Sequence, residues 1–178
     1  SITLIGRLLD DSRPIDRPYK TKRFKLIFNK GVLFYAEYNL RLFFFLLFKK
    51  HDIYHANDLD TLLPMWLVSS IYRKKLVYDT HEYFTGVPEI QNRYFVKKVW
   101  SSIEKFLFPK VKYVFTVNES ISELYFKKYK SPYIEYLDLN KSLSRSSIKS
   151  LSKYFNKIFS LSEILFKSII KLYKKDES

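Results

Sequence analysis

Apolar residues along this chain fall into short runs that alternate with longer stretches at helical spacing. Each short run predicts a strand, and the runs lie at 2–5, 24–28, 52–56, 75–79, 113–117 and 133–137. The longer stretches, in which apolar positions recur every three or four residues, predict helices at 34–48, 59–71, 96–107 and 119–125. Strands and helices that alternate in this way predict an α/β fold, with a parallel sheet covered by helices on both faces.

Three of the predicted helices carry further detail. The 34–48 stretch is apolar nearly all round toward its end, so we expect that helix to be well buried. Pro64 lies within the 59–71 stretch, where it removes a main-chain donor and is expected to kink the helix. The helix at 119–125 is expected to turn three apolar side chains inward, namely Ile121, Leu124 and Tyr125.

The character of the sequence changes near Asp138, which divides the chain into a domain at 1–138 and a tail at 139–178. The domain carries 23 basic and 15 acidic residues, whereas the tail carries 9 basic and 3 acidic residues and consists mainly of Lys, Ser, Leu, Ile, Phe, Tyr and Asn. The apolar positions of the tail fall roughly on one helical face. The tail is therefore expected to be either a basic amphipathic helix on an anionic membrane or a poorly folded terminal segment.

The composition excludes several kinds of site. The chain has only three glycines, far apart in the sequence, so it contains neither the glycine-rich dinucleotide fingerprint nor a P-loop. The absence of cysteine excludes disulfides, thiolate zinc sites, iron–sulfur clusters and cysteine nucleophiles. The spacing of the His and Asp residues matches no metal-binding motif, so we expect no metal and no resident cofactor. The most apolar run, 42–48, is too short to span a bilayer.

The net charge of +14 indicates an anionic partner, such as nucleic acid, a lipid surface or a phosphorylated substrate. The alternative is a solvated lysine-rich surface without a partner. The sequence has no zinc-finger spacing, no RNA-binding aromatic motif and no arginine-rich arm, so we do not expect it to bind nucleic acid.

Polar side chains follow three of the predicted strands at the point where each strand ends. They are Asn57, Asp58 and Asp60 after the run at 52–56, Asp79, His81 and Glu82 at the end of the run at 75–79, and Asn118 after the run at 113–117. The carboxyl ends of parallel strands meet at one edge of a sheet, so these residues are expected to converge on one cleft. Carboxylate and amide groups can pair with the hydroxyls of a carbohydrate.

The same residues also have a structural explanation. Asn57 or Asp58 can cap the helix that follows, and Asn118 can cap the helix after it. His81 and Glu82 instead begin a loop without helical periodicity. For His81 we therefore favour contact with a substrate or transfer of a proton, with a purely structural histidine as the alternative.

Four segments in order, HANDLDTL, YDTHE, WSSIEKFLFPK and TVNESI, resemble the N-terminal domain of bacterial group 1 (family 4-like) glycosyltransferases. The similarity covers roughly residues 2–133, and the combination is more specific than any single segment. The resemblance implies a Rossmann-like domain that forms one half of a two-domain GT-B fold. Enzymes of this family transfer a sugar from a nucleotide sugar to an acceptor, usually with retention and without a required metal.

The resemblance also implies roles for individual residues. His81 matches the family histidine that reaches toward the transferred sugar, and Glu82 accompanies it as a catalytic candidate. Asn57, Asp58 and Asp60 match the polar turn that forms a wall of the acceptor site. The remaining substrate-binding candidates are Asp79 and Asn118. The nucleotide sugar is a co-substrate, and its binding residues belong to a C-terminal domain with no counterpart in this sequence.

The sequence departs from the family pattern at both ends. The first strand and its glycine-containing loop are not found before Ser1, and the lysine-rich tail stands where a donor-binding domain is expected. We therefore expect a truncated glycosyltransferase domain that is inactive alone, cytoplasmic or peripheral on the inner face of the cytoplasmic membrane, with a lipid-linked or polysaccharide acceptor and a possible complementing C-terminal domain. The alternative is a non-catalytic module that binds a carbohydrate or a partner chain.

Overall fold

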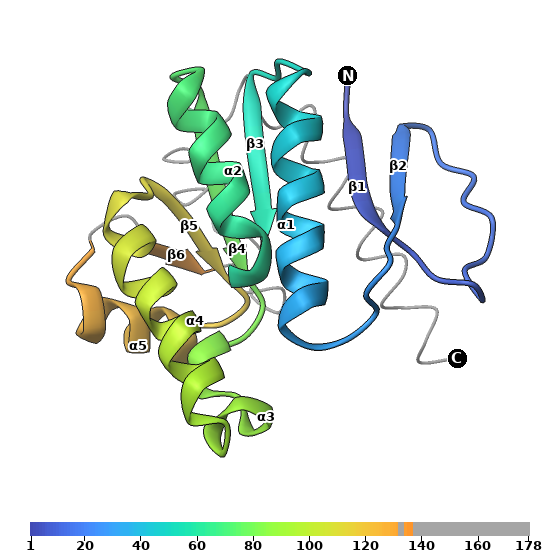
Figure 1. The fold of residues 1–178 in the computed structure, drawn as a ribbon. Coiled ribbons are helices and arrows are strands. Elements are labelled where there is room, and N and C mark those ends of the chain that lie inside the picture. Colours follow the sequence, from blue (N-terminus) through green and yellow to red (C-terminus); the bar gives the residue numbers. More distant parts are fainter. Residues whose placement is uncertain (132–133, 137–178) are drawn as a thin grey trace, which may run out of the picture. The chain divides into compact units, whose positions relative to one another are not determined.

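The computed structural model describes residues 1–131 and 134–136, and the elements below belong to one compact unit, Thr3–Asp138 (Figure 1). The strands are β1 (Thr3–Leu8), β2 (Lys20–Lys25), β3 (Ile53–Asn57), β4 (Lys75–Thr80), β5 (Tyr113–Thr116) and β6 (Ile134–Tyr136). The helices are α1 (Gly31–Leu47), α2 (Leu59–Ile71), α3 (Pro88–Gln91), α4 (Tyr94–Leu107) and α5 (Glu119–Tyr129), with short 3₁₀ turns at Phe84–Gly86 and Phe108–Lys110. The prediction of an α/β fold with parallel strands is confirmed.

The strands form two parallel sheets among the described residues. β1 pairs with β2, and a separate four-stranded sheet has the order β3-β4-β5-β6. In Figure 1, β1 and β3 point the same way on either side of α1. No hydrogen bonds between strands join the two sheets in this part of the chain.

The helices of the four-stranded sheet pack on one face, where the strand residues Tyr54, Ala56, Tyr78 and Val114 are buried. The alternate residues, such as His55, lie on the other face and are exposed or half-buried. The expectation of helices on both faces is therefore not met by the described residues. The reason is topological: each step from β3 to β6 moves in the same direction, so right-handed crossovers place all their helices on the same side.

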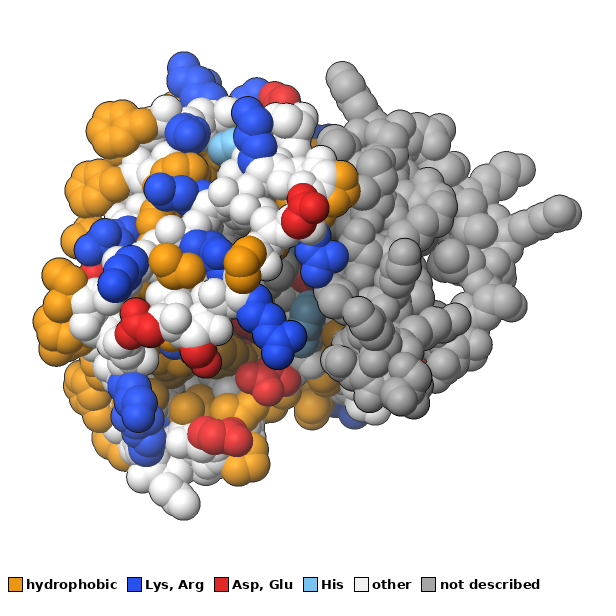
Figure 2. Space-filling model, turned by 90° about the vertical axis from the view of Figure 1, so that its right-hand side faces the viewer, with side chains coloured by type: hydrophobic (Ala, Val, Ile, Leu, Met, Phe, Trp, Pro, Cys, Tyr) orange, Lys and Arg blue, Asp and Glu red, His pale blue; other side chains and the backbone are white. Residues whose placement is uncertain are grey.

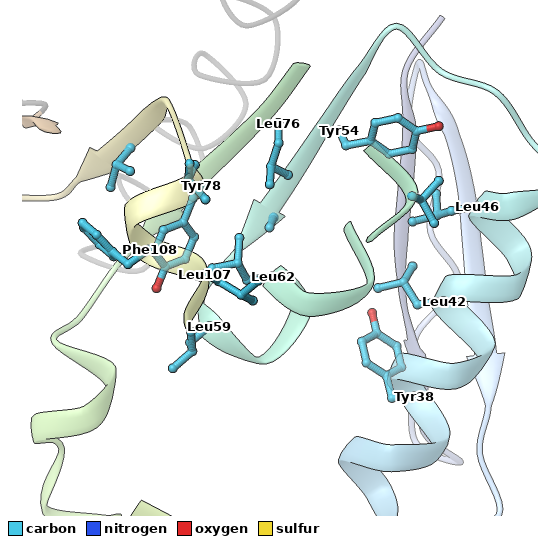
Figure 3. Close-up of a cluster of buried hydrophobic side chains, with 14 of the residues drawn as sticks. Tyr38, Leu42, Leu46, Tyr54, Leu59, Leu62, Leu76, Tyr78, Leu107 and Phe108 are labelled. Carbon is cyan, nitrogen blue, oxygen red and sulfur yellow. The ribbon is translucent and has the colours of Figure 1, made fainter. Parts of the chain in front are cut away.

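The core of this unit is strongly aromatic. Tyr78 of β4 meets Phe108 edge-on, with ring centroids 6.1 Å apart, and Phe108 stacks on Tyr125 of α5 at 4.6 Å. Figure 3 shows Tyr78 beside Phe108, with Tyr38 and other inward side chains of α1 on the opposite side of the cluster. These contacts fix the helices against the sheet and so hold the ends of β3, β4 and β5 in place.

The element boundaries differ from prediction mainly where polar residues join a strand. β1 continues to Leu8, and β2 lies at Lys20–Lys25, earlier than the apolar run at 24–28. The loop after β4 contains a 3₁₀ turn and α3, neither of which shows a periodic pattern. Positions 133 and 137 of the last predicted strand and the tail at 139–178 lie outside the described residues.

Two predictions about burial are wrong. α1 buries only one stripe, and Leu40, Phe44 and Phe48 on its other side are exposed. Leu124 of α5 is exposed rather than inward, although Tyr125 is fully buried. An apolar side chain need not be buried where no further layer covers the helix.

Candidate functional site

The carboxyl ends of β3, β4 and β5 lie at one edge of the sheet. Asn57 at the end of β3 pairs in register with Asp79 of β4, and Thr80 of β4 pairs with Thr116 of β5. The hydroxyls of Thr80 and Thr116 each donate to the carbonyl oxygen two residues on, at 2.7 and 2.9 Å. These matching turns direct the chain away from the sheet at equivalent points, so the following polar residues share this edge.

Asp58 connects two of the predicted segments. Its backbone amide donates to the carbonyl oxygen of Asp79 at 2.8 Å, and its carboxylate accepts from the backbone amide of His81 at 2.9 Å. Its own backbone, with φ 58° and ψ 171°, lies in a region that is essentially restricted to glycine. A strained aspartate at the end of a strand is a feature that functional sites often retain.

Asp79 lies between two histidines. One of its carboxylate oxygens is 3.5 Å from Nε2 of His55 and 3.4 Å from Nε2 of His81. Burial alone would raise the pKa of Asp79, but hydrogen bonds from the two histidines hold that pKa well below its usual value. The hydrogen bond to Asp79 also raises the pKa of His81 against the opposing effect of burial. Asp79 thus orients His81 and favours its protonated form.

Two further carboxyls at this edge have raised pKa values. Burial, followed by the charge of Asp58, raises the pKa of Asp60 to about 6. Burial and the nearby charges of Asp58 and Glu89 raise the pKa of Glu82. Several titrating groups with shifts of opposite sign are typical of binding and catalytic sites.

A pocket of about 560 Å³ adjoins the turn after β3. Asn57, Asp58 and Asp60 line one side, and β1 contributes Arg7. The remaining lining comes mainly from the first turns of α1 and includes Phe34, Tyr35 and Tyr38. The guanidinium of Arg7 lies 5.1 Å from the ring centroid of Phe34. The pocket therefore combines carboxylates, a cation and aromatic surfaces.

The seven predicted site residues do not all reach this pocket. Asn57, Asp58 and Asp60 line it, and Asp79 and His81 are tied to it through Asp58. The lining residues do not include Glu82 or Asn118. Asn118 caps α5, because its side-chain oxygen accepts from the backbone amide of Ile121 at 3.0 Å.

The predicted cap of α2 has a different outcome. Asp58 occupies the N-cap position, but its side chain makes no capping hydrogen bond. The exposed Asn57 contributes its carbonyl oxygen, which accepts from the Thr61 hydroxyl at 2.8 Å. The Asp58 side chain is therefore committed to the turn at His81 rather than to its own helix.

Sequence reasoning missed Arg7, Phe34 and Tyr35 as pocket residues. They come from β1 and α1, which approach the end of β3 only in the folded chain. No motif connects them to Asp58. Basic and aromatic residues recur throughout the sequence, so their presence at these three positions did not predict a pocket.

A buried ionic cluster beside the site was also missed. Glu104 of α4 is fully buried and accepts from Lys128 and Tyr129 of α5, each at 2.5 Å, and from Thr85 at 3.1 Å. Lys128 also donates to the Tyr83 hydroxyl at 3.0 Å. The cluster fixes the loop after His81 against α4 and α5. Glu104 shares the buried face of α4 with Trp100 and Leu107. A carboxylate at an apolar position of a helix is the sequence pattern that could have predicted this cluster.

Among the described residues, no three His, Cys, Asp or Glu side chains are arranged to hold a metal ion. No protein-family model and no curated protein matches this chain.

Proposed function

We propose that this chain forms the acceptor-side half of a glycosyltransferase of the GT-B type. The observation that carries the proposal is the contact between Asp58 and the backbone of His81, which joins the pocket to the histidine of the YDTHE segment. The parallel α/β architecture is compatible with a Rossmann-like half-domain of this kind. The order of the four resembling segments supports the same function.

The pocket suits the hydroxyl groups of a sugar. Asp58 and Asp60 offer carboxylate oxygens that accept from paired hydroxyls, and the Arg7 guanidinium donates to ring or hydroxyl oxygens. Phe34 and Tyr35 provide flat apolar surfaces against which the C–H face of a sugar ring can lie. We place the acceptor carbohydrate here, with Asn57 at its rim.

His81 and Glu82 are the candidate catalytic residues, and we expect them to lie beside the acceptor hydroxyl that reacts. His81 is held by Asp79 in a form that favours a proton on both ring nitrogens, so its free nitrogen can donate to an oxygen of the transferred sugar. The raised pKa of Glu82 makes its carboxylate a stronger base, which suits a group that accepts a proton from an attacking hydroxyl. Asn118 does not contact the acceptor in this proposal, because its side chain caps the start of α5.

Sugar transfer also needs a nucleotide-sugar site, and retaining transfer requires the leaving diphosphate to be neutralised in a closed cleft. The described residues contain no donor site that we can assign. We therefore expect this chain to bind an acceptor without transferring sugar unless a complementing domain is supplied. A lipid-linked acceptor would place the protein at the inner face of the cytoplasmic membrane.

The test is carbohydrate binding by the full chain on an array of oligosaccharides and lipid-linked sugars. We expect a bound glycan whose affinity falls about tenfold in Asp60→Asn and Arg7→Ala, because each variant removes a charged group from the pocket. Asp10→Asn is the control, because Asp10 lies on an exposed loop away from the pocket. The absence of any bound glycan, or equal losses in the control, would contradict the proposal.

A nucleotide-sugar turnover assay separates the enzyme half from a non-catalytic carbohydrate-binding module. Adding a donor-binding domain of the resembling family should produce transfer if the chain is half of an enzyme, and His81→Ala should then lower the rate without abolishing glycan binding. Binding without transfer under the same conditions would favour the module. Turnover by the chain alone would refute the expectation that it is inactive by itself.

A further inference from the structure

The outward side of α1 carries a stripe of exposed apolar side chains, which the Glu37–Arg41 ion pair interrupts. Leu33, Leu40 and Phe44 lie on one side of the helix at spacings of seven and four, and Phe48 follows at the C-cap. Their exposed fractions are 57%, 57%, 48% and 82%. The buried residues of α1, Tyr38, Leu42 and Leu46, lie on the opposite side. The helix is thus apolar on both faces, whereas a surface helix is normally polar toward solvent.

The neighbouring helices extend this surface. α2 exposes Leu67 and Ile71, and α4 exposes further apolar residues at spacings of four and seven, namely Phe95, Val99 and Phe106. The rings of Trp66 in α2 and Phe106 in α4 are in contact, with centroids 5.7 Å apart. In Figure 2, hydrophobic side chains run along the left-hand edge of the molecule, the side that faces the viewer in Figure 1, with Lys and Arg beside them. Exposed apolar side chains that gather on one face and are bordered by charged residues are typical of interaction surfaces.

The charges on these three helices are almost entirely basic toward solvent. The basic residues are Arg41 of α1 and Lys97, Lys98 and Lys105 of α4, and Lys49 and Lys50 follow the end of α1. The acidic residues are Glu37, Asp60 and Glu104. Glu104 is buried, Asp60 lines the pocket, and Glu37 is engaged by Arg41 at 2.8 Å and by the backbone amides of residues 27 and 28. Asp52, near the end of α1, pairs with Lys74 at 3.0 Å.

The lysines at the end of the stripe lie along aromatic rings. The ammonium of Lys49 is 4.9 Å from the ring centroid of Phe45, and that of Lys50 is 5.5 Å from the ring centroid of Tyr72. Their stems therefore cover apolar surface while their charges remain at its border, which is the arrangement that interfacial helices use against lipid head groups.

We propose that the outer face of α1, continued by α2 and α4, docks on an anionic lipid surface, with the α1 stripe buried at the level of the head groups and Lys49 and Lys50 paired with lipid phosphates. In this arrangement α1 lies in the plane of the membrane surface. The described residues contain no helix that could cross a bilayer. The central residues of the stripe, Leu40 and Phe44, do not line the pocket. Lipid binding here is therefore independent of whether the pocket binds a carbohydrate.

The experiment is flotation of the full chain with vesicles of phosphatidylcholine, with and without about one third phosphatidylglycerol. We expect binding to the anionic vesicles that falls about tenfold or more in the variant L40S/F44S, because two side chains that enter the interface are removed. The variant K49E/K50E should lose binding to anionic vesicles to a similar extent. This loss should be larger at low salt than at high salt, because salt screens the attraction between lysines and lipid phosphates.

The matched control is the variant L124S/F126S on α5, because these side chains are exposed to similar extents, 47% and 52%, outside the docking face. It should bind vesicles as the unmodified chain does, and circular dichroism should show that all variants are folded. The tail is present in every variant, so its own affinity for lipid cancels in the comparison. Failure of the unmodified chain to float, equal binding by L40S/F44S, or equal loss in the α5 control would overturn the proposal. Self-association that L40S/F44S abolishes, without vesicle binding, would assign the face to a second copy of the chain instead.

Discussion

The carboxylate of Asp58 accepts a hydrogen bond from the backbone amide of His81, 23 residues further along the chain, at 2.9 Å. This single contact ties the turn after β3 to the loop after β4. Asp58 makes this contact from a backbone conformation that an aspartate rarely adopts. The position of His81 thus depends on a side chain outside its own loop.

Substitutions at Asp58 should separate the hydrogen bond from the backbone strain. Asp58→Ala loses the acceptor and keeps the strain, so we expect the free energy of unfolding to fall by about 1–2 kcal/mol. Asp58→Asn keeps an acceptor oxygen and should cost less, and Asp58→Gly should lie between them because it relieves the strain. Urea unfolding measures all three. If Asp58→Ala left the free energy of unfolding unchanged, the hydrogen bond to His81 would contribute nothing to stability.

His81 and His51 should give the free energy of unfolding opposite dependences on pH. The pKa of His81 is raised by Asp79, so its stabilising effect is present below about pH 6.5 and is lost as the pH rises through the raised pKa. Burial lowers the pKa of His51, so its contribution has the opposite sign and stability grows as the pH rises through that range. Urea unfolding between pH 5 and 8 measures both effects. His81→Gln should remove the fall in the free energy of unfolding with pH, and His51→Gln should remove the rise. Slopes that neither variant changes would contradict both assignments.

Asp60 should destabilise the fold when it ionises. Its pKa of about 6 lies above that of an unfolded aspartate, near 3.9, so the folded state binds the proton more tightly and stability falls as the pH rises from about 4 to 6. Asp60→Asn should remove this fall and make the protein more stable at pH 7 by about 1–3 kcal/mol. Unfolding curves at pH 4.5 and 7 test this. Asp10→Asn, at an exposed position, is the comparison and should change neither the stability at pH 7 nor its fall between the two pH values.

The two partners of the Glu104–Lys128 pair should differ in their cost of removal. Glu104 is fully buried, whereas the Lys128 side chain is 35% exposed and can turn to water. Lys128→Met therefore strands a buried carboxylate and should cost about 3–5 kcal/mol, whereas Glu104→Gln should cost about 1–2 kcal/mol. Chemical denaturation compares them, with Lys127→Met on the exposed side of α5 as the control. Equal costs would mean that the burial of Glu104 does not set the energetics.

Periodicity in the sequence was sufficient to predict most elements of the fold. The apolar run at 75–79 and the spacing of Trp100 and Leu107 predict β4 and α4 with small errors at their ends, because both elements bury one regular face. The same reasoning overestimated the burial of α1. Hydrophobicity shows that a side chain can be buried, but which layer lies over it is a tertiary property.

The candidate site was only partly predictable. The rule that ligands bind at the carboxyl ends of parallel strands identified Asp58 and His81 as neighbours, and they are in contact. The rule could not find Arg7, because the approach of β1 to the turn after β3 is a tertiary contact that no local sequence pattern encodes. Nor could it separate Asn118, whose side chain is used as a helix cap, from residues that face the pocket.

The separation of β1–β2 from the four-stranded sheet implies that the two sheets of this unit differ in their resistance to local opening. No main-chain hydrogen bonds between strands connect β1 to β3 within the described residues, so β1 and β2 can open while β4 stays paired on both sides. Amide hydrogens of β1 and β2 should therefore exchange with solvent deuterium much sooner than those of β4 at equal pH. The pocket is lined by Arg7 of β1 and by Asp58 after β3, so local opening of the two-stranded sheet would remove Arg7 from the pocket while Asp58 stays in place.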